Sequence, residues 1–273
     1  MLQARSWLPR TEGLLRLGFA ARDGRTSLAD LHQAGAARVR FPSPGEGAPP
    51  EAVLLNTAGG LTGGDRIDLS VTLGAGAEAT VTTAAAEKIY RARDCEASIR
   101  VKLTLAPGAQ LAWLPQPTIL FDQSRLDRRT EVELAGDARF LAVEMLVFGR
   151  MAMGEDVHRG ACRDAWRVRR DGALAFADTF RAEGAVAGML DRQGTLAGAR
   201  AVAMLLYVAP DAEAKLDHVR ALLQSAQSVA GASAWNGVLV ARALAREGHT
   251  LYRDIAPVAE ALSGRPLPRV WQC

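Results

Sequence analysis

A glycine-rich stretch at residues 56–65 is the first place where the sequence could bind a ligand. Its glycines are Gly59, Gly60, Gly63 and Gly64. Such a loop can turn backbone N–H groups toward a phosphate. A Walker-type loop, however, ends in Lys and Ser or Thr, whereas Asp65 and Arg66 follow here and the acid would repel phosphate. A dinucleotide-binding loop opens a helix, but Ile67 begins a strand-like pattern. We therefore interpret the stretch as a wide turn that lets two backbone segments pass closely.

Hydroxyl, acidic and basic side chains are crowded together where a strand-like run that begins at Thr80 ends. They are Thr82, Thr83, Glu87, Lys88 and Tyr90. One interpretation is a strand end with a solvated Glu–Lys pair, which contributes little to stability. The other is a polar surface held in a fixed geometry for a partner or an ion. The residues alone favour the solvated pair, and both interpretations stay open at this point.

A single carboxylate, Glu144, stands in the otherwise apolar run 141–148. An isolated buried carboxylate is energetically expensive, so Glu144 needs a partner, a water or an altered protonation state. Arg150 is the first basic residue that follows it, and we take this residue as its candidate partner. Glu155 is a second acid close to the same arginine.

The sequence lacks the common motifs of nucleophilic and metal-dependent catalysis. It contains no Cys-x-x-Cys, no His-Glu-x-x-His and no Gly-x-Ser-x-Gly. Four histidines and three widely spaced cysteines in 273 residues do not resemble a permanent metalloprotein or a disulfide-stabilised secreted domain. The cysteines are Cys95, Cys162 and Cys273. We therefore expect no catalytic residues, no permanently bound cofactor and no resident metal.

Composition and charge restrict the class of protein further. The chain is 49% hydrophobic and 23% charged, which excludes disorder, a collagen-like repeat and a coiled coil. Its 33 basic and 30 acidic residues are interspersed, so the net charge of +3 indicates no nucleic-acid partner. The longest uncharged apolar run, 201–209, is far shorter than the roughly 20 residues that a membrane helix needs. The N-terminal residues carry no apolar signal-peptide core, and we expect a cytoplasmic protein.

These side chains must be positioned by β-strands over most of the chain. Apolar and polar residues alternate over 67–73 and 99–105, a pattern that suits antiparallel sheet with one buried face. Asp-Gly pairs at 23–24 and 171–172 predict two hairpins, because glycine accepts positive φ at little cost. No internal repeat at the spacing of a solenoid is visible.

The last quarter of the chain predicts two helices. Apolar residues at spacings of three and four run over 211–226 and again over 251–262, where Gly264 ends the second helix. Pro257 indicates a kink in that helix or a later helix start. Between the two helices, 238–244 is typical of a strand that returns to the sheet.

Taken in order, these stretches resemble the UreD family of urease accessory proteins, also called UreH. The resemblance spans roughly 13–272 and depends on an ordered set of short motifs. The matching residues are the stretches 59–65, 82–83, 88–91, 115–121, 149–155, 171–172 and 265–271, together with Glu144. The chain departs from the family at Ala84, where Gln is usual after the paired threonines, and at Gln272, where Arg is common after the Trp.

The resemblance implies a mainly β fold of extended, stacked antiparallel or mixed sheets with two α-helices in the C-terminal quarter. We accordingly expect a single domain over 1–273, with a β body over about 13–209 and a helix-containing part over about 210–264. The resemblance also implies a non-enzymatic maturation factor that binds apo-urease. With the accessory protein UreF and, through UreF, the GTPase UreG, such a factor supports nickel insertion into the urease active site through a polar tunnel.

The chemistry of nickel suggests which side chains would line that tunnel. Imidazole and thiolate bind Ni²⁺ tightly and would hold it, whereas carboxylates and hydroxyls exchange more readily and offset the cost of leaving water. We expect a transient nickel path along Asp65, Asp68, Thr82, Thr83, Glu87, Glu144 and Glu155. We expect Lys88 and Arg150 to hold acids in place electrostatically, with Tyr90 as a further supporting residue.

Two alternatives stay open at the level of sequence. The chain could be a pure scaffold that bridges UreF and urease while nickel travels elsewhere. It could also be an enzyme that uses the glycine-rich stretch as a phosphate or nucleotide site, which the missing motifs make the weaker alternative.

Overall fold

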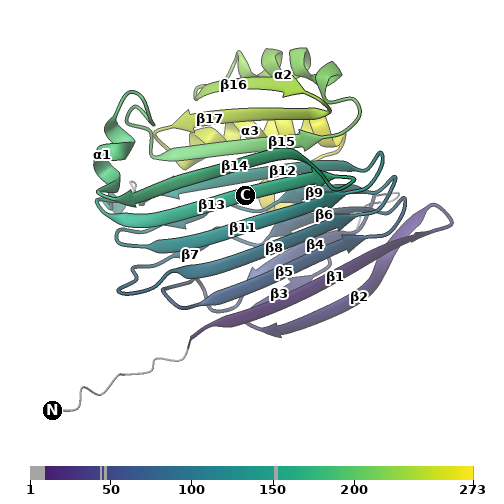
Figure 1. Ribbon diagram of the computed structural model, residues 1–273, viewed down its shortest axis with the longest axis horizontal. Helices are drawn as coiled ribbons and strands as arrows, with labels where there is room; N and C mark the ends of the chain where they lie inside the picture. Colours follow the sequence, from purple (N-terminus) through teal and green to yellow (C-terminus); the bar gives the residue numbers. More distant parts are fainter. Residues whose placement is uncertain (1–9, 44, 46–47, 151–152, 273) are drawn as a thin grey trace.

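The computed structural model describes residues 10–43, 45, 48–150 and 153–272. The expectations for the N-terminal residues and for Cys273 lie outside the described residues. Within them, the chain folds into two stacked β-sheets and three α-helices, as Figure 1 shows. The prediction of a mainly β fold with helices near the C-terminal end is therefore confirmed.

Sheet A has seven strands and sheet B ten among the described residues. In spatial order, sheet A consists of β14 (Ala173–Gly184), β13 (Gly160–Arg170), β11 (Arg125–Leu134), β8 (Ala97–Leu105), β5 (Arg66–Leu73), β1 (Glu12–Arg22) and β2 (Arg25–Gly35). Sheet B consists of β16 (Val229–Trp235), β17 (Val238–Ala245), β15 (Ala201–Val208), β12 (Arg139–Phe148), β9 (Gln110–Leu114), β6 (Glu78–Thr83), β4 (Glu51–Asn56) and β3 (Ala37–Arg40). Beside the end of β12, sheet B is extended by β10 (Thr118–Leu120) and then by β7 (Glu87–Ile89).

Two apolar cores hold three layers together (Figure 1). The larger core lies between the sheets, because alternate strand residues such as Val71 of sheet A and Val81 of sheet B point into the same space. The second core lies between the other face of sheet B and two helices, α2 (Leu216–Leu223) and α3 (Gly248–Ser263). β12 is therefore covered on both faces, which explains the unbroken apolar run around Glu144.

Neighbouring strands in the centre of both sheets are parallel, which corrects the antiparallel pairing expected for β5 and β8. From β5 to β13 the chain crosses to sheet B after each strand of sheet A and then returns, so each turn adds a strand to both sheets. Arg66 pairs with Ser98 in sheet A, and Glu78 pairs with Gln110 in sheet B. The two residues of each pair are 32 positions apart in the sequence. The next turn advances 29 positions in both sheets. Alternation indicates one buried face but not the strand direction.

The turns are stacked on a column of apolar side chains. Leu61 pairs with Ile89, Ile89 with Leu120, and Leu120 with Phe148, all in parallel orientation. Each of the four is at most 2% exposed. Because the column runs perpendicular to the strands, it ties consecutive turns of the chain to one another.

Both predicted Asp-Gly hairpins are present. Asp23-Gly24 joins β1 to β2, and Asp171-Gly172 joins β13 to β14. All four residues have positive φ, which is typical of the type I′ turn that matches the twist of the strands. Asn236-Gly237 forms a third hairpin of this kind between β16 and β17, and the sequence analysis did not single it out.

The predicted C-terminal helices are present with shifted boundaries. A 3-10 turn at Glu213–Lys215 precedes α2, which begins five residues after the predicted start at Asp211. α3 begins at Gly248 and contains Pro257, so the later start is wrong. A further helix, α1 (Val186–Asp191), was not predicted. None of the helices within the described ranges is long and apolar enough to cross a membrane.

Replacing Leu120 by alanine is expected to lower the free energy of unfolding by about 2–5 kcal/mol, because the change opens a cavity in the stacked column. Leu174→Ala is the matched control, since Leu174 is 57% exposed on β14. It should change the free energy of unfolding by no more than about 0.5 kcal/mol. Urea denaturation followed by circular dichroism measures both. Equal losses in the two variants would contradict the importance of the column.

Candidate functional site

The two sheets separate at one end to leave a cavity of about 260 Å³. Sheet A lines it with inward-facing apolar residues, among them Leu15 and Ile67. Sheet B contributes residues of β3, β4, β6 and β7, and the polar side chains among them include Asn56, Thr83 and Glu87. The cavity is thus an opening into the inter-sheet space. Its walls are apolar on the side of sheet A, and on the side of sheet B they mix apolar residues with polar and charged ones, including Arg38 and Lys88.

Glu87 lies half-buried in this cavity. Asn56 Nδ2 donates to both carboxylate oxygens of Glu87, at 3.1 and 3.2 Å. Burial raises the pKa of Glu87, while the bond from Asn56, the Lys88 N–H and the charges of Arg128 and Lys88 oppose that rise. The charge of Lys88 is the smallest of these effects, and its side chain is exposed.

A line of polar groups continues from Glu87 into the interior. Thr118 lies beside Glu87 on the neighbouring strand β10. Arg128, which projects from β11 in the opposite sheet, donates through Nη1 to Thr118 Oγ1 at 2.9 Å. In sheet A, Arg128 pairs with Ile99 on the next strand, and Ile99 pairs with Ile67 on the strand after that. Arg128 therefore lies two strands, or about 10 Å, from Ile67, which lines the cavity. The polar line therefore crosses from sheet B to sheet A.

Arg128 brings together carboxylates from both sheets. Its Nε and Nη2 donate to Oδ1 and Oδ2 of Asp164 at 3.0 and 2.6 Å, a two-point contact within sheet A. Nη2 also lies 2.7 Å from Oε1 of Glu144, which projects from sheet B. This second contact brings the charges together but is not aligned as a hydrogen bond. All three side chains are at most 7% exposed.

Two carboxyl groups face one guanidinium in this buried cluster, so its charges balance only when one carboxyl group is protonated. Burial raises the pKa of Glu144 to about 8, against the opposing charge of Arg128. Burial alone would lower the pKa of Arg128, but the charges of Asp164 and Glu144 raise it above its ordinary value. Cys162 lies on the same inward face of β13, and burial raises the pKa of its thiol. Burial thus favours the uncharged forms of Glu144 and Cys162.

The glycine-rich stretch is closed by neighbouring backbone and side chains. A Cβ on Gly60 would lie 2.4 Å from the Tyr90 ring, and one on Gly63 would lie 2.3 Å from the Cys95 carbonyl oxygen. Tyr90 Oη donates to the carbonyl of Gly59 at 3.3 Å, which holds the ring against the loop. The two segments pass at a separation that only glycine allows.

The acids near this stretch are engaged locally and lie apart from the inter-sheet polar line. Asp65 accepts backbone hydrogen bonds from Thr11 and Thr62, both at 2.8 Å, so its carboxylate occupies amides that a phosphate would need. Asp68 lies on the outer face of sheet A, with its Oδ2 2.6 Å from Nε of Arg66. The structure therefore does not bring Asp65 or Asp68 to the cavity.

The paired threonines point to opposite faces of sheet B, because successive strand residues alternate. Thr83 lines the inter-sheet cavity, and its Oγ1 accepts from the Gln116 N–H at 2.8 Å. Thr82 Oγ1 donates to the Leu114 carbonyl at 2.6 Å on the other face. The Leu114 carbonyl oxygen also accepts a hydrogen bond from Nε1 of Trp271, which lies in the C-terminal 3-10 turn Arg269–Trp271. Thr82 therefore helps to dock the C-terminal segment.

Arg150 pairs with Glu155 rather than with Glu144. Its Nε donates to Glu155 Oε2 at 2.8 Å, and its guanidinium lies 4.6 Å from the centroid of the Phe121 ring. The Tyr90 ring also packs against Phe121, with the two ring centroids 4.9 Å apart. The partner assigned to Glu144 from the sequence is therefore wrong, because β12 takes Glu144 into the interior while the following turn leaves Arg150 largely exposed.

Sequence reasoning missed Arg128, Asp164 and Thr118, which complete the buried cluster. The sequence did carry one signal. Arg128 is a charged residue at an inward-facing position of a strand in which buried and exposed residues alternate. In β11, Leu126 and Val132 point into the inter-sheet core on the same face as Arg128. A charged residue in such a row needs a buried partner, but the row does not say which distant strand supplies it.

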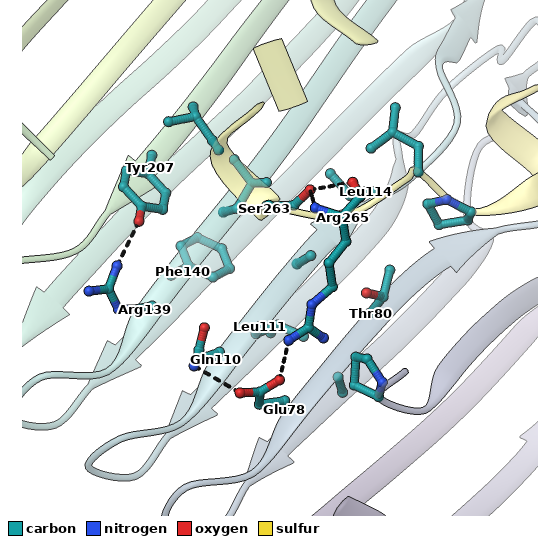
Figure 2. Close-up of a pocket in the computed structure, with 18 of the residues that line it drawn as sticks. Glu78, Thr80, Gln110, Leu111, Leu114, Arg139, Phe140, Tyr207, Ser263 and Arg265 are labelled. Atoms are coloured by element: carbon teal, nitrogen blue, oxygen red, sulfur yellow. Dashed lines mark hydrogen bonds and ion pairs between the residues drawn. The ribbon is translucent and has the colours of Figure 1, made fainter. Parts of the chain in front are cut away.

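A larger groove of about 730 Å³ lies on the outer face of sheet B, beneath the segment that follows α3 (Figure 2). Its charged side chains are largely paired with one another. Arg265 contacts Glu78, and Arg139 donates to both Tyr207 and Asp211 at 2.9 and 2.7 Å. The groove contains none of the site residues expected from the sequence, so the candidate site is the inter-sheet line and not this larger hollow.

The polar line between the sheets presents oxygen atoms of the kind that ligate a metal ion, and they come from successive strands of sheet B. Carboxylate, hydroxyl and amide oxygens are ligands that release a divalent cation more readily than imidazole or thiolate. Among the residues that the structure describes, no group of three or more His, Cys, Asp or Glu side chains could hold a metal ion.

Comparison with known proteins finds one family over most of the chain. A family model described as UreD urease accessory protein matches residues 11–272. The chain is 50% identical over 262 residues to the urease accessory protein UreD of Azorhizobium caulinodans, covering 96% of both chains. It is 50% identical to that of Xanthobacter autotrophicus, covering 96% of this chain and 90% of the relative. It is 48% identical to that of Rhizobium etli, covering 96% and 95%.

The raised pKa of Glu144 predicts a pH-dependent stability. Between the ordinary value of 4.5 and about 8, the folded state keeps a proton that the unfolded state has released, so the free energy of unfolding falls as pH rises. Glu144→Gln should remove this part of the slope, and its stability relative to the wild type should increase from pH 5 to pH 8. Urea denaturation across that range measures the difference. Parallel pH profiles for the two proteins would contradict the assignment.

Proposed function

Because this chain belongs to the UreD family of urease accessory proteins, we propose that it acts in urease maturation by binding apo-urease and supporting nickel insertion. In this proposal, nickel moves between the two sheets along the polar line that begins at Glu87. The observation that carries it is the connection from Glu87 through Thr118 to Arg128 and Glu144 inside an otherwise apolar core. Nickel is the cargo of the protein here and not a resident cofactor.

The physical requirement for such a route is a partial replacement of water. A dication that leaves water needs oxygen ligands at each step, but ligands that release it again. Glu87 is placed at the cavity, where Asn56 orients its carboxylate and leaves it half-buried. Thr83 adds a hydroxyl to the same cavity. Glu144 supplies the next carboxylate, from the neighbouring part of sheet B.

The remaining parts of the proposal concern partners and compartment. We propose that UreF binds this chain directly and that UreG joins through UreF, with the complex working in the cytoplasm. The same fold would also serve as a pure scaffold between UreF and urease, since both roles need large protein contacts. What favours the route over the scaffold is the burial of ionisable groups that a scaffold does not need.

Glu87→Gln is expected to lower the nickel content of co-expressed urease several-fold, because the amide keeps the shape of the side chain but loses the negative charge. Nickel is measured by elemental analysis of purified urease, alongside co-purification of the accessory complex. Glu133→Gln makes the same chemical change on the outer face of sheet A, where Glu133 is 41% exposed, and should leave nickel content unchanged. Full nickel content with Glu87→Gln in an intact complex would favour the scaffold.

A further inference from the structure

The two carboxylates of the buried cluster are held unequally. Asp164 accepts two aligned hydrogen bonds from Arg128, whereas Glu144 has a single close contact with the same guanidinium. Glu144 is 6% exposed, and its Oε1 points into the cluster without a hydrogen-bond partner among the described residues. The cluster therefore contains a fixed pair, Arg128 with Asp164, and a second carboxylate that another cation could engage.

We propose that Arg128 is an internal counter-charge that prevents Glu144 and Asp164 from jointly holding a divalent cation. Arg128 keeps Asp164 occupied, so a cation in the inter-sheet space meets Glu144 as a single carboxylate. The identity of that cation rests on the proposed function, since nickel is the cargo assigned there. The role of Arg128 is that of a positioning residue, which sets how tightly the cluster binds a cation.

Electrostatics supports this role. Two ionised carboxylates in a site that excludes water bind a dication far more tightly than one, because charge interactions are strong where the effective dielectric constant is low. With Arg128 in place, the cluster carries at most one net negative charge, and only when Glu144 and Asp164 are both ionised. Without Arg128, the same two side chains carry two negative charges and face each other across the gap between the sheets. Such a pair would hold the ion instead of releasing it.

The geometry explains why the counter-charge is an arginine. The planar guanidinium contacts Asp164 with Nε and Nη2 while Nη1 donates to Thr118, so three bonds fix it across both sheets. A lysine would supply the same charge at this position without the two-point contact. A lysine at position 128 therefore tests the positive charge separately from the shape of the guanidinium. If the charge is what matters, Arg128→Lys should bind nickel as weakly as the wild type.

Binding of Ni²⁺ alone to the purified full-length protein tests the inference, with the affinity measured by equilibrium dialysis and elemental analysis. Arg128→Met is expected to bind Ni²⁺ at least roughly 100-fold more tightly than the wild type. Adding Asp164→Asn to Arg128→Met restores the net charge of the cluster and should abolish the gain. Arg163→Met is the matched control, because it removes a guanidinium 3.1 Å from Asp127 on the outer face of the same two strands. It should gain no Ni²⁺ binding.

A second measurement covers the case in which Arg128→Met is only marginally stable without metal. Ni²⁺ should then raise its melting temperature, and should do so more than for the double variant. No gain in either measurement, or an equal gain in the double variant, would overturn the inference. The urease assay with Glu87→Gln is independent of it. Tight Ni²⁺ binding by Arg128→Met together with full urease nickel in Glu87→Gln would reject the proposed route and leave the counter-charge standing.

Discussion

The contact between Arg128 and Asp164 joins two neighbouring strands of sheet A inside a space that apolar side chains otherwise fill. Taking either charge out of water costs several kcal/mol, so the pair is stable there only with close geometry and further bonds. The two-point contact and the bond to Thr118 supply them. Because Thr118 belongs to the opposite sheet, the hydrogen bond from Arg128 also links the two sheets.

The parallel winding of the chain makes that interaction possible. Each turn places one strand in each sheet, so residues 29 to 36 positions apart become neighbours in a row. Glu87 and Thr118 are such neighbours, and so are Arg128 and Asp164. Apolar rows in the same winding form the column of Leu61, Ile89, Leu120 and Phe148, which keeps the turns stacked. Polar and apolar rows thus lie side by side in one interior.

This arrangement suits transfer better than storage. The oxygen atoms come from different strands. Glu87 and Thr118 already accept hydrogen bonds from neighbours, and Glu144 lies in close contact with Arg128. Asp164 is already paired with Arg128, so a cation that enters has to compete with a guanidinium. The family to which the chain belongs is named for its service to urease, and a weak interior path is compatible with that service.

The sequence by itself determined the alternating strands, the two Asp-Gly hairpins, the two late helices and the buried position of Glu144, because each follows from a periodicity or turn preference within a few residues. It also determined that Glu144 needed a partner. Only the tertiary structure decided that this partner is Arg128 and not Arg150, and that Thr83 faces the cavity while Thr82 does not. Strand direction, turn length and sheet stacking set those contacts, and unequal turns of 32 and 29 positions leave no repeat in the sequence from which to infer them.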